Sequence, residues 1–483
     1  MAVSLELFPD QTEYEKKEKC GLFGVWGTPD ASRIVYQGIF ALQHRGQESA
    51  GMAVSDGQNL SGVNGMGLVS QVFNPRMLTE ELAGTAAIGH VRYSTTGSSK
   101  LCNAQPLLRQ FSLGPVAVAH NGNLINAALL RSEYEQHGHI FQSTTDTEII
   151  VHLLAKPTHA DKPDPLLHVL KHLQGAYSLL FLFPDRLEAV RDPWGVRPLV
   201  IGKTSQGQWC VASETCAFDA IEAQFIREVE PGEIVRIDDT GLTSRRFAAP
   251  AEEMAHCVFE HVYFANPASK IFGQTVHTAR QRMGQQLARE APVTADYVMP
   301  MPDSGRSAAL GFARESNIPF EEGIVPNRFV GRTFILPQQG QRDRAVAMKL
   351  NIIPDVIDSK RIVIVEDSVV RGTTTRSKMR AIRRAGAKEI HLRVSCPPIR
   401  NPCFYGIDFP TSTELIAHNR TVEQIREFLE VDSLAYLSLD GMLSCMKYEP
   451  KRYCTACWSG QYKIPVDQPQ SKFSFEREQL KMF

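Results

Sequence analysis

The sharpest change from apolar to polar positions in this chain lies at residues 362–375. Residues 362–365 are all apolar and β-branched, which predicts a strand buried on both faces of a parallel sheet. Two acids follow at once, and apolar residues then recur at helical spacing up to Ala385, with Gly386 suited to end the helix. The segment predicts strand, loop and helix. Its loop should lie at the carboxyl end of the sheet, where open α/β folds bind ligands.

Two other apolar runs add to this picture. Residues 176–183 form the most conspicuous run, but its eight residues stop at Pro184, which is too short to span a bilayer. Residues 297–301 form a second run, and the polar loop 302–307 follows it. That loop is compatible with two interpretations, an N-cap with a turn or a second ligand-binding loop.

The polar residues after the first strand indicate the kind of ligand. Gly372 allows close backbone approach, and the hydroxyl and N–H groups of 373–375 lie at a predicted helix N-terminus, which attracts anions. Glu366 and Asp367 can accept hydrogen bonds from the vicinal hydroxyls of a sugar. A phosphate at one end and a diol at the other describe a ribose 5-phosphate. A generic buried strand with a polar turn explains the apolar run but not these residues.

This loop resembles the binding loop of the type I phosphoribosyltransferases, which use phosphoribosyl pyrophosphate (PRPP). The resemblance implies that the following residues bind PRPP: Glu366, Asp367, Ser368, Arg371, Gly372, Thr373, Thr374 and Thr375. It also implies Mg²⁺, because a cation must neutralise charge on the departing pyrophosphate, with Ser304, Glu366 and Asp367 as candidate ligands. The basic, glutamine-rich stretch 332–349 is similar to the mobile lid of that family. A solvated surface loop is the alternative interpretation of this stretch.

Composition limits the number of domains, the partners and the cellular compartment that we expect for this chain. A chain of 483 residues is long enough for two or three domains, and a net charge of −1 with a pI near 6.9 gives no indication of nucleic-acid or membrane partners. Residues 1–19 are acidic and lysine-rich without an apolar core, unlike a signal peptide. We therefore expect a cytoplasmic protein. Its ten cysteines should be reduced and serve packing, catalysis or metal binding.

A second chemistry is indicated at Cys20, which begins a small and apolar stretch directly after the charged residues 15–19. If residues 1–19 are removed, Cys20 carries a thiol and a free α-amino group. Such an amine has a reference pKa of about 7.7–8.0, so it is partly neutral and can act as the base for its own thiol. A buried, inert cysteine is the alternative when this residue is taken alone.

Four downstream segments, 43–51, 89–97, 120–123 and 145–148, favour the catalytic interpretation, although the His-Asn-Gly of 120–122 taken alone also suits a turn. Together with Cys20 they resemble the N-terminal-nucleophile glutamine amidotransferases, which implies a four-layer αββα sandwich with the nucleophile at the start of a strand. The resemblance also implies roles for six residues. Glutamine is bound by Arg92, Thr95 and Asp146. The oxyanion hole is formed by Asn121 and Gly122, and Cys20 is the nucleophile.

A glutaminase followed by a phosphoribosyltransferase is similar to the glutamine PRPP amidotransferase family, and the resemblance covers residues 20–465. It implies a propeptide at 1–19, a glutaminase domain at 20–250, a transferase domain with a mostly parallel sheet at 256–465, a linker near 247–254 and a tail at 466–483. The implied reaction hydrolyses glutamine and passes the ammonia to C1 of PRPP. A homotetramer inhibited by purine nucleotides is a further implication.

Cys454 and Cys457 form a Cys-x-x-Cys pair that suits zinc, an iron–sulfur cluster or redox exchange. In the cluster-bearing branch of the family, two further ligands stand where this chain has Cys257 and Cys403, which implies a [4Fe–4S] cluster. The same branch carries a cleaved propeptide. Cys396 and Cys445 match nothing in that pattern, so we expect them to pack in the core.

Two positions depart from the family pattern. Pro326 stands where a lysine is usual, and Glu366 replaces the more usual aspartate of an acid pair. Three rival interpretations explain less of the chain. An aminosugar synthase lacks the loop after residue 365, a PRPP-sensing regulator does not need the complete glutaminase set, and an iron–sulfur scaffold accounts only for four cysteines.

Overall fold

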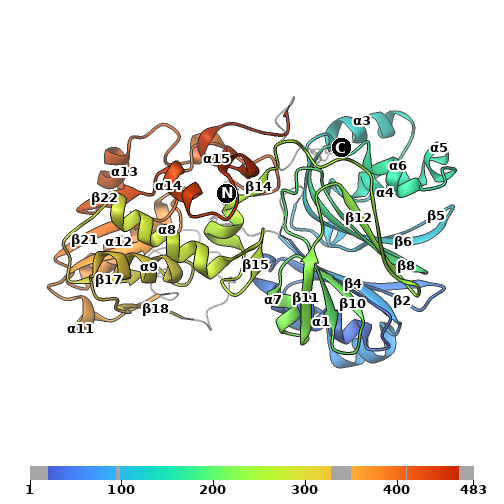
Figure 1. Ribbon diagram of the computed structural model, residues 1–483, viewed down its shortest axis with the longest axis horizontal. Helices are drawn as coiled ribbons and strands as arrows, with labels where there is room; N and C mark the ends of the chain where they lie inside the picture. Colours follow the sequence, from blue (N-terminus) through green and yellow to red (C-terminus); the bar gives the residue numbers. More distant parts are fainter. Residues whose placement is uncertain (1–19, 94–97, 328–349, 410, 467–483) are drawn as a thin grey trace, which may run out of the picture.

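The computed structural model describes residues 20–93, 98–327, 350–409 and 411–466. Two bodies lie side by side, the first half of the chain on the right of Figure 1 and the second half on the left. The expected propeptide (1–19), Thr95, the lid (332–349) and the tail from 467 fall outside the described residues. No helix among those described is long and apolar enough to cross a membrane.

The first half is built on two antiparallel sheets. The strands of the first sheet are β1 (Gly21–Trp26), β2 (Ser49–Ser55), β3 (Leu60–Met66), β4 (Ala86–Arg92), β9 (Val200–Thr204), β10 (Trp209–Ala212) and β11 (Ala223–Glu228), in the order β11-β9-β10-β1-β4-β2-β3. The strands of the second are β5 (Leu107–Phe111), β6 (Gly114–Leu124), β7 (Gly175–Phe183), β8 (Arg186–Arg191), β12 (Glu233–Asp238) and β13 (Gly241–Arg246), in the order β13-β12-β8-β7-β6-β5.

Helices cover the outer face of each sheet (Figure 1). Those on the first sheet are α1 (Ala31–Ala41), α2 (Val69–Val72) and α7 (Cys216–Asp219); those on the second are α3 (Ala127–Gln136), α4 (Glu148–Ala155), α5 (Pro157–Ala160) and α6 (Pro165–Leu170). Short helical turns occur at η1 (Gln43–Arg45), η2 (Met77–Glu81) and η3 (Leu101–Asn103).

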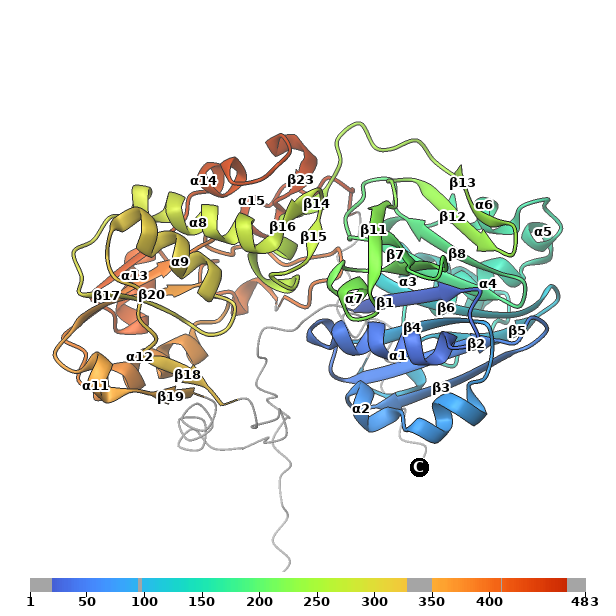
Figure 2. The ribbon, with the colours of Figure 1, turned by 60° about the horizontal axis from the view of Figure 1, so that its bottom comes forward.

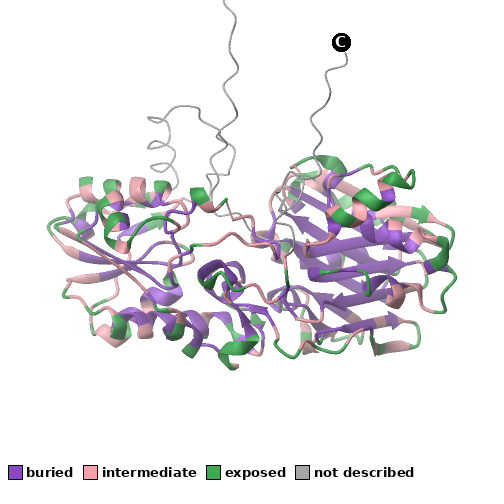
Figure 3. Cartoon of the chain, turned by 90° about the horizontal axis from the view of Figure 1, so that it is seen from above, coloured by how far each residue is buried: buried purple, intermediate pink, exposed green. Residues whose placement is uncertain are grey.

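Alternating side chains fill three apolar layers between these elements. In β1, Phe23 packs toward α1 while Leu22 packs between the sheets. In β7, Phe181 faces the helices α3–α6 and Leu180 faces the first sheet, so the apolar run 176–183 is continuous because both faces of the strand are buried. Figure 3 shows this burial along both sheets. The predicted αββα sandwich is confirmed.

The second half contains a parallel sheet with helices on both faces (Figure 2). Its strands are β17 (Tyr297–Pro300), β20 (Arg361–Glu366), β21 (Glu389–Val394) and β22 (Ser433–Tyr436), in that order. Its helices are α8 (Val276–Glu290), α9 (Arg306–Ser316), α11 (Pro354–Ile357), α12 (Thr373–Arg384), α13 (Val422–Leu429), α14 (Leu439–Ser444) and α15 (Ala456–Ser459). The predicted mostly parallel sheet is confirmed.

The strand–loop–helix unit expected after residue 361 is present. β20 is buried along 362–366, and α12 ends at Arg384, two residues before Gly386, whose φ of +98° suits glycine. The apolar run 297–301 supplies β17, which pairs with β20.

Short strand pairs and a helical turn surround this sheet. They are β14 (His256–Cys257) with β23 (Tyr453–Cys454), β15 (Lys270–Ile271) with β16 (Gln274–Thr275), β18 (Ile324–Pro326) with β19 (Leu350–Ile352), and the turn η4 (Glu260–Phe264). Pro326, one of the two departures, is the last residue of β18 and lies opposite Leu350. Residues 247–255 carry neither helix nor strand and connect β13 to β14.

Candidate active sites

Cys20 lies directly before β1, as expected for a nucleophile at a strand start. Its side chain is buried, its Sγ lies 3.6 Å from the Tyr93 carbonyl oxygen, and its own carbonyl accepts a 2.9 Å hydrogen bond from Arg45 Nε. Burial raises the pKa of the thiol, and the Arg92 and Arg45 guanidiniums act in the opposite direction. Within the described part of the chain, no histidine or carboxylate hydrogen-bonds this sulfur, so a base must come from elsewhere.

Two of the expected glutamine-binding residues lie beside Cys20. Antiparallel pairing sets Gly21 opposite Val91, so Cys20 and Arg92 share one end of the β1–β4 pair. Arg92 and Asp146 are buried, and each exerts an electrostatic influence on the Cys20 thiol. A guanidinium and a carboxylate beside a thiol can hold the carboxylate and ammonium groups of an amino acid.

Asp146 is held in place by three groups. Its Oδ2 accepts a 2.9 Å hydrogen bond from the Leu124 N–H, and its Oδ1 lies 3.2 Å from the Thr145 hydroxyl and 3.6 Å from His120 Nδ1. Burial opposes the charged carboxylate, but these partners outweigh it and lower the pKa of Asp146. His120 was in a segment singled out from the sequence, yet its contact with Asp146 had no sequence signal.

Asn121 and Gly122 lie within β6, so this segment is a strand rather than a turn. Asn121 is buried, and its Nδ2 has no hydrogen-bond partner among the described residues. Gly122 has φ +154°, and a Cβ there would lie 1.9 Å from the Ala176 carbonyl oxygen, so no other residue fits. A buried amide donor without a partner is suited to an oxyanion that forms only during reaction.

The second site lies where the strand order of the parallel sheet reverses. After β17 the chain passes through α9 to Phe320, which bridges Val298 in parallel, and it then returns to β20 on the other side of β17. The loops after β17 and β20 therefore leave the sheet at a topological switch point, the usual ligand crevice of open α/β sheets.

A carboxylate joins these two loops. Asp367 is buried and accepts hydrogen bonds from the hydroxyls of Ser304 and Ser368. Ser304 comes from loop 302–307, which forms a turn and supplies Gly305 as the N-cap of α9, although no side chain caps this helix. Glu366 is also buried, with Lys378 Nζ 3.8 Å from its Oε2. Carboxylate and hydroxyl oxygens of this kind suit a hard cation such as Mg²⁺.

The remaining loop residues lead into the N-terminus of α12. Gly372 has φ +78°, and a Cβ there would lie 2.5 Å from Ile416 Cδ1. Thr373, the first residue of α12, starts the turn that contains Thr374 and Thr375, and Arg371 forms an ion pair with Glu414. The first N–H groups of an α-helix have no partner within the helix and can bind an anion such as a phosphate.

The four cysteines assigned to a metal centre converge from three distant segments. Parallel pairing of β14 with β23 sets Cys257 opposite Cys454. The negative charges of the Cys403, Cys454 and Cys257 thiolates would raise the pKa of the Cys457 thiol. All four thiols have raised pKa values because of burial, that of Cys454 to about 12.

The spacing of these sulfurs bears on which metal they suit. Among the described residues, ligand atoms that all lie within 4.8 Å of one another form two groups, and neither includes these cysteines. A single tetrahedral zinc ion requires sulfurs about 3.8 Å apart, given a Zn–S distance of about 2.3 Å. Cys396 and Cys445 are both buried in the apolar core of this half, as expected.

The two sites are joined by buried polar contacts that were not predicted. Both guanidinium NH groups of Arg45 bond the Glu260 carboxylate of η4 at 3.1 Å, and Glu214 binds the same arginine. Arg280 then donates to the carbonyl oxygens of 261, 263 and 265 in and beside η4. Burial lowers the pKa of Arg280 to about 10, with the charge of Asp367 acting against this shift.

The fold and the residues gathered at these two places define a class of protein, a glutamine amidotransferase domain joined to a type I phosphoribosyltransferase domain. Comparisons with known proteins agree. The family described as glutamine amidotransferase domain matches residues 90–220. The amidophosphoribosyltransferase of Methanothermobacter thermautotrophicus is 46% identical over 471 residues, 96% of this chain and 98% of its own length. That of Synechocystis is 48% identical over 456 residues, 93% and 92% of the two chains.

Solved structures extend this similarity to the fold. The B. subtilis glutamine PRPP amidotransferase, solved with ADP and GMP, superposes with a TM-score of 0.88 at 43% identity and covers 94% of this chain and 100% of its own. An allosteric regulatory enzyme of purine biosynthesis superposes with a TM-score of 0.89, also at 43% identity, over 95% and 100%. The chain belongs to the amidophosphoribosyltransferase family.

Proposed function

We propose that this chain hydrolyses glutamine at Cys20 and transfers the ammonia to C1 of PRPP, forming 5-phosphoribosylamine, glutamate and pyrophosphate in the first committed step of purine biosynthesis. The observation that carries this proposal is the set of buried polar contacts that connects the two halves. Arg45 donates hydrogen bonds to the Cys20 carbonyl and to the Glu260 carboxylate of η4. Arg280 donates to a backbone carbonyl of η4, and the charge of Asp367 acts on Arg280. Ammonia produced within one chain then need not pass through water, where it would be mostly protonated.

The glutaminase half follows from the groups around Cys20. After removal of residues 1–19, its α-amine accepts the thiol proton, and the thiolate attacks the carboxamide carbon of glutamine. Asn121 Nδ2 and the Gly122 N–H stabilise the oxyanion, and ammonia leaves as the thioester forms. Water then hydrolyses the thioester and releases glutamate. Arg92 and Asp146, with Thr95, hold the substrate throughout.

The transferase half follows from the loops at the switch point. The N–H and hydroxyl groups of 373–375 bind the 5-phosphate of PRPP, and Glu366 with Asp367 binds its ribose hydroxyls. Ser304, Glu366 and Asp367 are the residues that would hold Mg²⁺, which supplies charge neutralisation for the departing pyrophosphate. Ser368, Arg371 and Gly372 complete the loop that surrounds the substrate.

We infer that Cys257, Cys403, Cys454 and Cys457 hold a [4Fe–4S] cluster. The four thiols are close enough to influence one another, yet they are not drawn together as a single zinc ion requires. A [4Fe–4S] cluster, which is larger than a single zinc ion and is held by four cysteine thiolates, fits these four residues. Because its ligands come from β14, the 403 loop and the 454–457 segment, the cluster would fasten the two ends of the second half to each other.

Replacing Cys457 with alanine should remove most of the bound iron and lower the thermal midpoint by at least about 5 °C, because a structural metal centre contributes folding free energy directly. Iron content and visible absorption after anaerobic purification measure this. Cys445→Ala is the matched control, since Cys445 is buried in the same half and its thiol donates to the Gly441 carbonyl of its own helix. Stoichiometric zinc without iron in the unaltered protein would refute the cluster.

Other features of the family come to this chain as proposals. Residues 1–19 are a propeptide, 20–250 and 256–465 are the two domains, 332–349 is the lid and 466–483 is the tail. The protein is cytoplasmic, forms a homotetramer and is inhibited by purine nucleotides. The nucleotide proposal is supported by the B. subtilis relative, which was solved with ADP and GMP.

The function is tested by product stoichiometry. With glutamine, PRPP and Mg²⁺, the full-length processed protein should release glutamate and pyrophosphate in a ratio of about 1:1, because ammonia passes between the sites without escaping. Enzymatic assays of both products measure this ratio. Glutamate release without any pyrophosphate would show that the transferase half is inactive and would overturn the joint assignment.

A further inference from the structure

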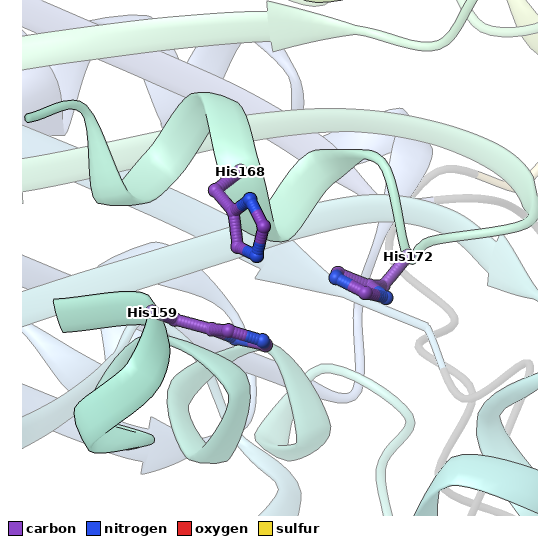
Figure 4. A group of neighbouring side chains, drawn as sticks. All are labelled: His159, His168 and His172. Carbon is purple, nitrogen blue, oxygen red and sulfur yellow. The ribbon is translucent and has the colours of Figure 1, made fainter. Parts of the chain in front are cut away.

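Three histidines converge on the outer helical layer of the first half, away from both active sites. They are His159, His168 and His172, and each has one ring nitrogen within 4.8 Å of a ring nitrogen of the other two. Figure 4 shows the three rings turned toward a common point. We propose that these histidines bind a divalent transition-metal ion of the zinc, nickel and copper class.

The local sequence explains how the three rings meet. His168 lies in α6, and the helical turn continues past its end because the His172 N–H donates to the Val169 carbonyl at 2.9 Å. Histidines four residues apart on a helical turn project from the same face, the spacing found in helical zinc sites. His159, from the neighbouring helix α5, supplies the third ring from the opposite side.

Two of the three histidines have hydrogen bonds that are independent of a metal. His159 Nδ1 lies 2.9 Å from the Leu153 carbonyl oxygen, which can only accept, so Nδ1 carries the proton and Nε2 keeps its lone pair for a ligand. Metal-binding histidines usually donate their second nitrogen in this way. The His172 carbonyl accepts a 2.9 Å hydrogen bond from Asn126 Nδ2.

The helix that carries His168 is anchored as well. The Asp164 side chain caps α6 by accepting from the Leu167 N–H at 3.0 Å, and Arg245 of β13 binds the same carboxylate. Val169 and Leu170 of this helix pack in the apolar core beneath it. His159 and His168 therefore project from helices, and His172 projects from the turn that continues α6, so the three rings lie together without a metal.

Ordinary ring packing accounts less well for this group. The nearby pair His139 and His152 is enclosed by Tyr134 and Phe141, which gives those rings aromatic partners. The three rings of the proposed site contact one another, with centroids 4.7–5.3 Å apart. They range from buried His159 to exposed His172, so an ion can enter from solvent.

The charges around the group permit a cation. Lys156 contributes a positive charge near His159 and His172, with its Nζ 5.6 Å over the Tyr134 ring, and Glu133 contributes a negative charge near His172. The second convergent group in the described chain, His44 with Glu214 and Cys216, is different. Glu214 already binds the buried guanidinium of Arg45, which occupies the place a metal cation would take.

The donor type selects the class of ion. Three neutral imidazoles suit zinc, nickel and copper, whereas Mg²⁺ and Ca²⁺ require oxygen ligands. Three protein ligands leave one position of a tetrahedral ion for water. A bound ion would fasten α5 to α6 above the core of the second sheet, which gives it a structural role separate from both reactions.

The proposal is tested by titrating the full-length protein with Zn²⁺ against a chromophoric chelator, with excess Mg²⁺ present. The unaltered protein should bind one more zinc ion per chain than His172→Ala or His168→Ala. The affinity at this site should fall at least about 100-fold in either variant, because loss of even an outer hydrogen-bond partner weakens metal sites by 10–100-fold.

His137→Ala is the matched control. His137 is exposed and its ring bonds only the Glu133 carbonyl of its own helix, so zinc binding should not change. Because the cysteines are the same in all variants, the difference between proteins isolates the histidine group. Equal zinc binding by the unaltered protein and His172→Ala would overturn the proposal, as would displacement of this zinc by Mg²⁺. Because His172 is exposed, its replacement by alanine should leave the fold intact, so a loss of zinc binding would report on the site and not on folding.

Discussion

Replacing Cys20 with serine should lower glutamine-dependent formation of phosphoribosylamine at least about 10⁴-fold, the scale of loss when a covalent nucleophile is removed. Formation from added ammonia should stay within about 2-fold, because the second site binds PRPP and ammonia with residues of other elements. Glutamate release measures the first reaction and pyrophosphate release measures the second. The contrast between the two nitrogen sources locates the defect in glutamine hydrolysis.

The burial of Cys20 explains why the effect should be so large. Burial raises the pKa of its thiol, so few molecules would carry a thiolate without a base, and a serine hydroxyl would ionise even less. Under the proposed function, the α-amine exposed by removal of residues 1–19 supplies that base. Intact-mass analysis should therefore find the N-terminus of the active protein at Cys20.

Cys102→Ser is the control for this substitution, because Cys102 is an exposed cysteine of the same half. Its glutamine-dependent activity should equal that of the unaltered protein. A Cys20→Ser protein that still forms product from glutamine would disprove the role of Cys20. An active protein whose N-terminus remains at Met1 would disprove the role of cleavage.

Much of the fold was predictable because local pattern and burial agree. β20 is apolar on both faces since it lies inside a parallel sheet, and Gly386 follows α12 since only glycine readily adopts its φ of +98°. Cys20 could be placed at a strand start because apolar residues begin directly after it. Signals of this kind are contained within a few neighbouring residues.

Contacts between distant segments left no such signal. Arg45 belongs to a segment singled out from the sequence, yet its partner Glu260 lies 215 residues away in the other half. The segment 120–123 allowed a turn as an alternative, but pairing of β6 with β7 makes it a strand. The three-histidine group was missed because His159 is not part of the periodic His168–His172 pair. Side-chain partners across the fold depend on tertiary packing, which residue type does not specify.

The buried contacts between the halves give a physical basis for coordinating the two reactions. Burial disfavours the charged form of Arg45, but Glu260 and Glu214 outweigh it and raise its pKa. The guanidinium therefore stays charged and holds the Cys20 carbonyl and η4 together. The backbones of Gly406 in the second half and Gly122 in the first half also contact each other closely, since a Cβ on Gly406 would lie 2.7 Å from the Gly122 carbonyl carbon. Any displacement of η4 would therefore be transmitted through Arg45 to the backbone of Cys20.

The other large effect is expected at Asp367, whose replacement by asparagine should lower pyrophosphate release about 10²–10³-fold with either glutamine or ammonia as nitrogen source. Asparagine keeps the shape and can still accept from one serine hydroxyl, so the loop should fold. It loses the negative charge that we propose to bind the ribose hydroxyls and Mg²⁺, and that balances buried Arg280. Steady-state assays with each nitrogen source measure the effect.

Two controls show why charge at Asp367 rather than general damage should be responsible. Asp355→Asn changes an exposed aspartate of α11 in the same half and should retain full activity. Glu366→Asp restores the usual acid pair and keeps both charges, so its activity should stay within about 10-fold, because a shortened carboxylate can still interact at a longer distance. Glutamate release without PRPP should survive in Asp367→Asn, since Cys20 and its oxyanion donors lie in the other half. If ammonia-dependent synthesis also survives, Asp367 does not bind PRPP, and the carboxylate that joins the two switch-point loops is only structural.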